Sequence, residues 1–143
     1  MKYALIPAAL LAWASCGSAI ADSNGVAASN SSTGATGAEI YGRICQGCHM
    51  PQAQGAAGAG KYPSLAGDPA LASSEFVAVT VLLGRRAMPA FGKPAEAGFV
   101  FGEVHISDAE IAEVVNYVRS HFGNQYKDRI AAAKIESLPH PIN

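Results

Sequence analysis

The sequence has 143 residues, a length typical of one domain. Ten basic and eleven acidic residues give a formal net charge of −1, and the chain has no long run of basic residues. The composition therefore lacks the electrostatic signature of a nucleic-acid-binding protein.

Residues 1–21 are predicted to be a signal peptide. Lys2 supplies a positive charge, residues 3–13 form an apolar run, and a cleavage motif ending at Ala21 follows. The run is shorter than the roughly 20 residues that a membrane span needs. We therefore expect export to the periplasm. Two alternatives stay open: an uncleaved N-terminal anchor, and a lipid anchor on Cys16, whose surroundings resemble a bacterial lipoprotein signal.

The rest of the chain divides into three predicted parts. Residues 22–37 are almost all Ser, Asn, Gly, Ala and Thr, and they should form a flexible linker because they offer little apolar surface to bury. A domain is expected at 38–124 and a C-terminal extension at 125–143. No segment after residue 21 is long and apolar enough to span a membrane.

The first two predicted helices flank a long loop. Residues 39–45 have apolar side chains at helical spacing. Residues 73–83 form the second helix, which Gly84 ends. Between them, residues 52–61 are rich in Gly, Ala and Gln and are predicted to be loop, with no strand pair. The apolar faces comprise Ile40, Tyr41 and Ile44 in the first helix, and Phe76, Val79 and Leu83 in the second.

The third predicted helix has the clearest pattern in the chain. A capping box between Ser107 and Glu110 opens it, and Gly123 ends it. One further short helix is expected at 126–136. Short helices joined by long loops offer a poor core, so we expect a large apolar group at the centre of the domain. The apolar stripe of the third helix consists of Ile111, Val114, Val115, Val118 and Phe122.

The motif Cys45-Gln46-Gly47-Cys48-His49 is the attachment signature of c-type haem. Two thiols three residues apart point to the same side of a helical turn, where both can bond to the vinyl groups of one porphyrin. The following His49 is then placed to bind the iron as proximal ligand. Export fits, because haem is attached to such chains outside the cytoplasm. We therefore predict one covalently attached haem c per chain.

Two other interpretations of this motif are weaker. A thioredoxin-like dithiol expects a parallel sheet around C-x-x-C, and the sequence has no credible strands. A structural zinc site needs a second close pair of ligands. The remaining histidines are scattered along the chain instead, and His121 and His140 are expected on the surface. The other remaining histidine is His105.

Met88 is the predicted second axial ligand of the iron. It follows the second helix in a loop with room to reach the distal face, whereas Met50 adjoins His49 on the proximal side and cannot reach that face. Two alternatives stay open: His105 as the ligand, and Met88 as a core-filling side chain. Ligation by methionine raises the reduction potential of haem iron.

The order of these motifs resembles that of class I c-type cytochromes of the small bacterial periplasmic type. The resemblance covers about residues 38–124 and implies an all-α fold of short helices and long loops wrapped around one covalent haem. It also implies that the carbonyl of Pro63 accepts a hydrogen bond from the His49 ring. The motifs that carry it are 45–49, the turn at 62–67, 81–84 before Met88-Pro89, and 107–119.

By the same resemblance, Gly42 and Tyr117 lie where the first and last helices cross. Similar cytochromes have fewer residues between the methionine loop and the third helix, so residues 91–106 are an insert. This insert either shapes a docking surface or covers the haem edge. Arg85 and Arg86 pair with haem propionates, steer an acidic partner, or stabilise a helix C-terminus.

The resemblance implies an electron-transfer protein rather than an enzyme. We expect a single-haem periplasmic carrier that accepts electrons from a dehydrogenase and passes them to an oxidase or another cytochrome of the respiratory chain. The tail after Asn124 is similar to that of cytochromes that serve as subunits of periplasmic dehydrogenases, so an obligate subunit is one alternative. A gas-binding or sensing haem protein with an open distal site is another, and a thiol oxidoreductase is a third.

Overall fold

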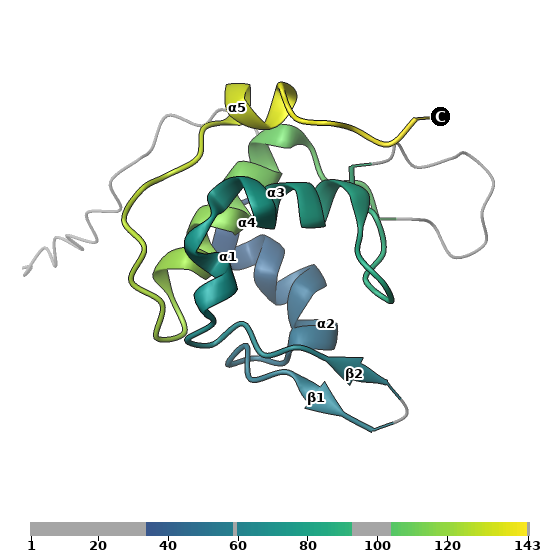
Figure 1. Cartoon of the computed structure of the whole chain (residues 1–143), viewed down its shortest axis with the longest axis vertical. Helices are drawn as coiled ribbons and strands as arrows, with labels where there is room; N and C mark the ends of the chain where they lie inside the picture. Colours follow the sequence, from purple (N-terminus) through teal and green to yellow (C-terminus); the bar gives the residue numbers. More distant parts are fainter. Residues whose placement is uncertain (1–33, 59, 93–103, 143) are drawn as a thin grey trace, which may run out of the picture. The chain divides into compact units, whose positions relative to one another are not determined.

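The computed structural model describes residues 34–58, 60–92 and 104–142. These residues belong to one compact unit, Ser31–Asn143. The predicted signal peptide, and most of the predicted linker and insert, lie outside the described residues. Helices and loops make up most of the described chain, together with one small sheet, in agreement with the predicted all-α fold (Figure 1).

The first helical segment opens at a capping box. The backbone N–H of Glu39 donates to the Thr36 hydroxyl, and the Glu39 carboxylate accepts from the Thr36 backbone, which satisfies two free donors. The segment then continues without a break to the histidine of the haem motif. It consists of α1 (Gly37–Ile40), a π-helical turn η1 (Tyr41–Cys45) and α2 (Gln46–His49).

The apolar face predicted for this first helix is confirmed. Ile40 and Tyr41 are each 3% exposed, and Ile44 is partly buried against the core. The π-helical turn has no counterpart in the sequence prediction, and it ends on the first cysteine of the motif. Such single turns inside helices are frequent at functional sites.

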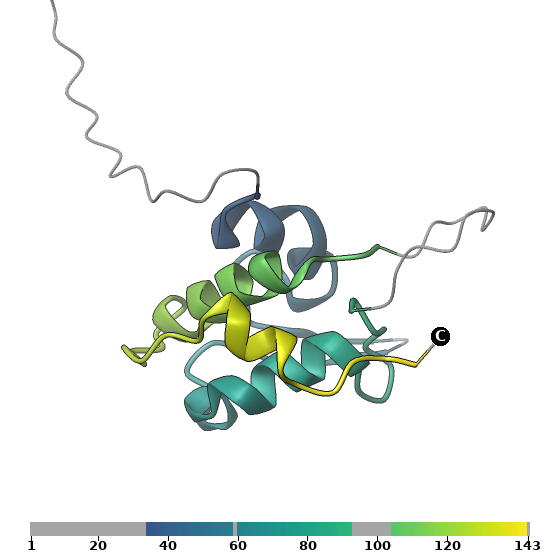
Figure 2. The ribbon, with the colours of Figure 1, turned by 90° about the horizontal axis from the view of Figure 1, so that it is seen from above.

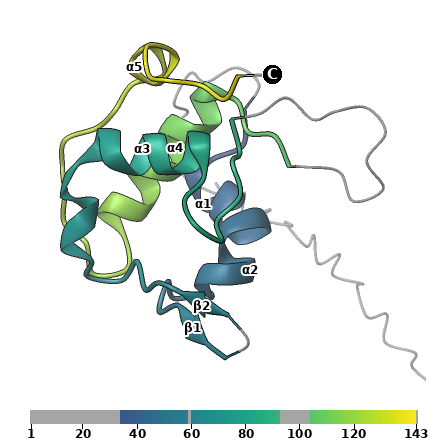
Figure 3. The same cartoon turned by 45° about the vertical axis from the view of Figure 1, so that its right-hand side comes forward.

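A small β-hairpin interrupts the predicted loop at 52–61. Strands β1 (Ala56–Ala57) and β2 (Lys61–Tyr62) pair antiparallel, and the Gly58 N–H donates to the Gly60 carbonyl within the turn. The prediction of no strand pair is therefore wrong here. Two-residue strands of Ala, Lys and Tyr carry no alternating pattern that could indicate them. In Figures 1 and 3 the hairpin lies beside α2, at the end of the molecule away from α5.

The second predicted helix is confirmed, but its buried face is different. Helix α3 (Ser74–Leu83) follows the short 3₁₀ helix η2 (Pro69–Ala72), and Gly84 ends it at φ 71°. The predicted apolar face is wrong, because Phe76 and Leu83 are 43% and 41% exposed. This helix is apolar almost all round, so periodicity could not choose a face. Its buried residues are Ala78 and Leu82.

The third predicted helix is the central element of the described chain. Helix α4 (Asp108–Ser120) opens at the predicted capping box of Ser107 and Glu110. The four aliphatic residues of its predicted stripe are at most 5% exposed, whereas Phe122 lies beyond the helix and is partly buried. Figure 2 shows α4 between α1 on one side and α3 and α5 on the other. None of the described helices is long and apolar enough to cross a membrane.

The helix crossing predicted at Gly42 occurs at Gly37 instead. A Cβ atom on Gly37 would lie 2.3 Å from the carbonyl oxygen of Glu113 and 2.6 Å from the Cβ of Tyr117. Apart from its own helix, no atom of the described residues comes within 4 Å of the corresponding position on Gly42. Tyr117 is at the crossing as expected, but the backbone that approaches it belongs to the first turn of the helical segment. Gly42 lies five residues further on, where a helix presents a different face.

The C-terminal helix is shorter than predicted. Helix α5 (Ala132–Glu136) occupies only the second half of the segment 126–136. The first half is extended because side chains of α4 bind its backbone. The Asn116 side chain donates to the carbonyl of Ile130 and accepts from its N–H, both at 2.9 Å. Backbone groups held in this way cannot take part in helical hydrogen bonds.

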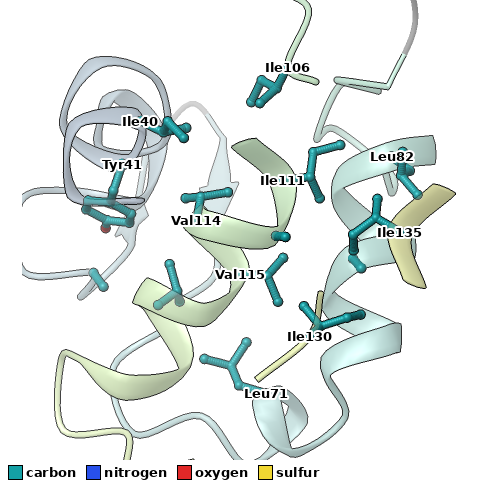
Figure 4. Close-up of a cluster of buried hydrophobic side chains, with 14 residues drawn as sticks. Ile40, Tyr41, Leu71, Leu82, Ile106, Ile111, Val114, Val115, Ile130 and Ile135 are labelled. Atoms are coloured by element: carbon teal, nitrogen blue, oxygen red, sulfur yellow. The ribbon is translucent and has the colours of Figure 1, made fainter. Parts of the chain in front are cut away.

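The hydrophobic core gathers around α4 (Figure 4). Ile111 and Val115 of α4 pack with Leu82 of α3 and with Ile135 of α5, and all four are at most 1% exposed. The C-terminal segment therefore supplies part of the core. The described residues provide more core of their own than the sequence indicated.

Candidate haem site

The two cysteines of the haem motif line one cavity, as their spacing predicts. Cys45 ends the π-helical turn and is partly buried, whereas Cys48 lies in α2 and is exposed. The two thiols are free and not bonded to each other. Burial, and to a smaller degree the neighbouring Cys48, raise the pKa of Cys45 to about 11. Redox-active dithiols have the opposite property, a lowered pKa, so the thiol oxidoreductase alternative loses support.

His49 has one ring nitrogen fixed by the backbone. It is 8% exposed, and its Nδ1 lies 3.0 Å from the carbonyl oxygen of Pro63. A carbonyl can only accept, so Nδ1 carries the proton and Nε2 keeps its lone pair for a metal. The acceptor also makes the imidazole a stronger electron donor.

Gly55 allows the backbone to bring His49 and Pro63 together. Its N–H donates to the His49 carbonyl at 3.0 Å. A Cβ atom on Gly55 would lie 2.4 Å from the Tyr62 carbonyl oxygen and 2.7 Å from the Pro63 carbonyl carbon, and its φ is +70°. Only glycine accepts both conditions without strain. The role of Gly55 is not visible in the sequence, because one glycine in a Gly-rich loop carries no distinguishing signal.

Met88 is presented by a short, closed loop. Arg85 and Met88 exchange two backbone hydrogen bonds, each of 3.0 Å. Gly84, at φ +71°, passes so close that a Cβ there would lie 2.6 Å from the Met88 carbonyl oxygen. After the loop, Phe91 donates to the carbonyl of Val81 at 2.9 Å, which ties the chain back onto α3. These contacts hold Met88 in a defined place, partly buried.

Two adjoining cavities meet at these side chains. The inner one, of about 170 Å³, is walled by aliphatic residues of α3 and α4 and by the segment 65–71. The outer one, of about 320 Å³, opens beside the hairpin and the Met88 loop. A larger groove of about 490 Å³ lies elsewhere, against Ser107 and Arg129, and contains none of the candidate residues. Both site cavities are lined by Cys45, His49, Pro63, Thr80, Arg85 and Met88.

The competing ligands lie outside these cavities. Met50, His105, His121 and His140 are not among the described residues that line either one. His121 stacks on the ring of Tyr117, with centroids 4.1 Å apart. The His140 ring bonds to Asp108 at 2.9 Å. Met88 is therefore the better candidate for the second ligand.

The donor set and the walls fit a covalently held haem. Two thiols border the outer cavity, a buried imidazole presents Nε2, and a thioether sulfur is held nearby. Imidazole and thioether are a common ligand pair for haem iron. The walls are mostly apolar, as a porphyrin requires.

Comparisons with known proteins agree with this chemistry. The sequence model of the cytochrome c family matches residues 34–122. The chain is 32% identical over 107 residues to the cytochrome c subunit of the quinone alcohol dehydrogenase of Gluconobacter oxydans (strain 621H), covering 73% of this chain and 22% of that protein. It is 26% identical over 113 residues to the corresponding subunits of Gluconacetobacter polyoxogenes and Komagataeibacter europaeus, covering 78% of this chain and 24% of theirs.

The chain therefore belongs to the cytochrome c family. The predicted class I c-type cytochrome, similar to dehydrogenase cytochrome subunits, is confirmed. Membership of this family implies covalently bound haem c and supports a role in electron transfer. The chain spans less than a quarter of the length of the curated relatives that it matches.

Proposed function

We propose that this protein is a single-haem electron carrier of the periplasm. Cys45 and Cys48 attach the haem, His49 and Met88 bind its iron, and Pro63 orients His49. When bound, the haem supplies a one-electron couple. The protein holds the same two ligands in both oxidation states, which keeps the reorganisation that accompanies electron transfer small.

The observation that carries this proposal is the buried imidazole of His49. Its Nδ1 bond to the Pro63 carbonyl, at 3.0 Å, leaves Nε2 available in a cavity that Met88 also lines. A buried histidine held in one tautomer by a backbone carbonyl is the usual arrangement of a metal ligand. Its neighbours in the chain are two thiols at the spacing of haem attachment.

Each further residue of the site has a definite task in this proposal. Gly55 and Gly84 let the backbone approach the two ligand-bearing segments closely. Aliphatic side chains of α3 and α4, among them Val81 and Val115, keep water from the inner cavity. Exclusion of water matters because the solvent exposure of a haem is one determinant of its potential.

The mouth of the outer cavity supports docking of an acidic redox partner. Within the described residues, four lysine and arginine side chains form ion pairs with carboxylates. Lys61, Arg85, Arg86 and Lys127 form none there. The first three of these line the outer cavity, and no described carboxylate does. Unpaired positive charge is thus concentrated where an electron would enter or leave, although the whole chain has a net charge of −1.

Arg85 and Arg86 differ in their surroundings. The Arg85 guanidinium lies over the ring of Phe76, 5.6 Å from its centroid, and Arg85 lines both cavities. It is therefore suited to pair with a carboxylate of the haem. Arg86 lines only the outer cavity and is exposed, which suits a role in steering the partner. We propose a periplasmic dehydrogenase as the donor and an oxidase or another cytochrome as the acceptor.

A second candidate function is that of a fixed subunit of a dehydrogenase complex. The curated relatives favour it, because all three are cytochrome c subunits of quinone alcohol dehydrogenases. The electron-transfer chemistry would be the same, and only the permanence of the partner would differ. Co-purification of this chain with a dehydrogenase at high salt would favour the subunit, and purification alone would favour the free carrier.

The remaining parts of the chain complete the proposal. Residues 1–21 direct export, 22–37 link that signal to the cytochrome domain at 38–124, and 125–143 form its C-terminal extension. Export places the thiols of Cys45 and Cys48 where haem attachment takes place.

Covalent attachment gives the direct test of this function. The full chain, purified from the periplasm, should keep the haem absorbance after denaturation and organic extraction, and its mass should exceed that of the mature chain by one haem. Cys45→Ala combined with Cys48→Ala should lose both signals. A wild-type chain that is colourless, or that gives up its haem to the solvent, would refute the proposal.

A further inference from the structure

Arg119 is a fully buried cation that joins two distant parts of the chain. Its side chain is 0% exposed, although it stands on the central helix α4. Its Nε donates to the carbonyl of Leu71 at 2.8 Å, and its Nη2 donates to that of Ala72 at 3.0 Å. On the other side, Nη1 donates to the backbone carbonyl of Asp128, and Nη2 donates to both of its carboxylate oxygens, at 2.9 and 2.8 Å.

The carbonyls that Arg119 binds belong to a wall of the inner cavity. That wall is the segment 65–72, four of whose residues line the cavity. Two residues that follow α4 are also hydrogen-bonded to this wall. The Asn124 side chain donates to the carbonyl of Leu65 at 2.9 Å, and the Gly67 N–H donates to the carbonyl of Phe122 at 3.2 Å. The lining residues of this wall are Leu65, Asp68, Ala70 and Leu71.

Asp128 is the anion that keeps the Arg119 side chain in place. It belongs to the C-terminal segment 124–142, which lies beyond the family match at 34–122. The ring of Tyr126, from the same segment, lies 5.3 Å from the Arg119 guanidinium carbon. A buried guanidinium needs a charged partner. The Asp128 side chain is 68% exposed, so it can be replaced without leaving a hole in the core.

We infer that the segment 124–142 braces the wall of the haem cavity through Arg119, and that this brace limits how far water reaches the haem. Arg119 is thus a positioning residue. The inference deepens the proposed function and rests on it for the identity of the group held. Without the Asp128 carboxylate, the guanidinium keeps only neutral carbonyl acceptors, which bind it more weakly, so we expect its bonds to the Leu71 and Ala72 carbonyls to open more often.

The sign of the change in potential separates this effect from simple electrostatics. Removing a negative charge near an oxidised, more positive haem disfavours oxidation and raises the potential. Admitting water favours the charged, oxidised form and lowers the potential. Asp128→Asn removes a carboxylate, so a lowered potential would point to the opened wall.

Glu113→Gln provides a matched control. Glu113 and Arg129 form another ion pair between α4 and the C-terminal segment, at 3.7 Å, in which the carboxylate stands on α4 and the arginine on the segment. Glu113→Gln removes one negative charge, as Asp128→Asn does. Among the hydrogen bonds of the described residues, however, none joins Arg129 to the wall at 65–72. Asp128→Glu serves as the conservative variant.

The experiment measures hydrogen exchange of the segment 65–72 and the midpoint potential in the full holoprotein. In Asp128→Asn we expect exchange to be at least threefold faster, and the reduction equilibrium constant to fall at least threefold, about 28 mV at 59 mV per tenfold. Glu113→Gln should change neither, and Asp128→Glu should restore both in large part. Equal behaviour of Asp128→Asn and Glu113→Gln would overturn the inference, as would faster exchange with no fall in potential.

Failure of the proposed function would look different. The wild-type chain would then carry no covalent haem, whatever the variants do. The exchange comparison would still decide whether Arg119 braces the wall, since equal exchange in the two variants overturns the brace with or without haem.

Discussion

The Nδ1 atom of His49 lies 3.0 Å from the carbonyl oxygen of Pro63, although the two residues are fourteen positions apart in the chain. This contact depends on Gly55, whose missing side chain lets three backbone segments meet. The orientation of one imidazole is therefore decided by a glycine in a loop that looks unremarkable in sequence.

Gly55→Ala is expected to disturb this contact. An alanine at φ +70° costs about 1–2 kcal/mol, and its Cβ would push the Pro63 carbonyl away. A weaker acceptor makes the imidazole a poorer donor to oxidised iron, so the potential should rise, by about 59 mV for a tenfold effect. Potentiometry of the purified holoprotein measures this. Gly58→Ala is the control, because no atom of the described residues beyond its chain neighbours lies within 4 Å of its added Cβ. Equal shifts in both variants would contradict the role of Gly55.

Met88→Ala should keep the haem covalently attached and open its iron to external ligands. Because methionine ligation raises the potential, its loss should lower the potential by at least about 59 mV, a tenfold effect. Carbon monoxide binding to the reduced protein and potentiometry check this. Met50→Leu, outside both cavities, should behave as wild type. An unchanged spectrum and potential in Met88→Ala would show that another group binds the iron.

Gly37→Ala should destabilise the crossing of α1 and α4. Its Cβ would lie 2.3 Å from a backbone oxygen, so we expect a loss of about 1–3 kcal/mol in the free energy of unfolding. Gly42→Ala has open space and stands in a helix interior, so it should gain about 0.5–1 kcal/mol. Denaturant unfolding of both variants measures the difference. If Gly42→Ala were the less stable of the two variants, the assignment of the crossing to Gly37 would be wrong.

Reversing charge at the cavity mouth should slow reaction with an acidic partner. Arg86→Glu or Lys61→Glu should reduce the second-order rate by about tenfold at low ionic strength, and added salt should narrow the gap. Stopped-flow oxidation by an acidic redox protein measures the rate. Lys127→Glu makes the same charge change at an exposed position that does not line the outer cavity. If Lys127→Glu slowed the reaction as much as the other two variants, the net charge of the protein, and not the charges at the outer cavity, would explain the slower rate.

The His140–Asp108 contact gives a pH dependence of stability. The bond to the Asp108 carboxylate, with a second to the Leu138 carbonyl, raises the pKa of His140 above its ordinary value of 6.5. The stabilisation is therefore complete below about pH 6.5 and is lost as the pH rises through the raised, folded-state pKa. His140→Gln should remove this part of the pH profile of the melting temperature. His121→Gln should leave it, and a profile unchanged by His140→Gln would refute the assignment.

The features that the sequence predicted are encoded locally. The spacing of Cys45, Cys48 and His49 and the capping box of Ser107 each lie within a few consecutive residues. Family resemblance added the expectation that Pro63 accepts from His49, and the structure has that contact at 3.0 Å. These features can be recognised without knowledge of which distant segments meet.

The features that the sequence did not predict depend on contacts between segments that are far apart in the chain. Gly37 matters only because α4 passes over it, and Arg119 matters only because η2 and Asp128 reach it from opposite sides. The buried face of α3 could not be chosen, because apolar side chains occupy nearly every direction around that helix. The extended start of the C-terminal segment follows from the side chain of Asn116, fourteen residues away.

The measurement that tests the central claim most directly is the visible spectrum of the purified holoprotein, oxidised, reduced, and reduced under carbon monoxide. A closed iron, held by His49 and Met88 on both sides, should give sharp reduced bands that carbon monoxide leaves unchanged. A wild-type spectrum that shifts with carbon monoxide would contradict the account, because the iron would then have an open position and ligand binding rather than electron transfer would be its function.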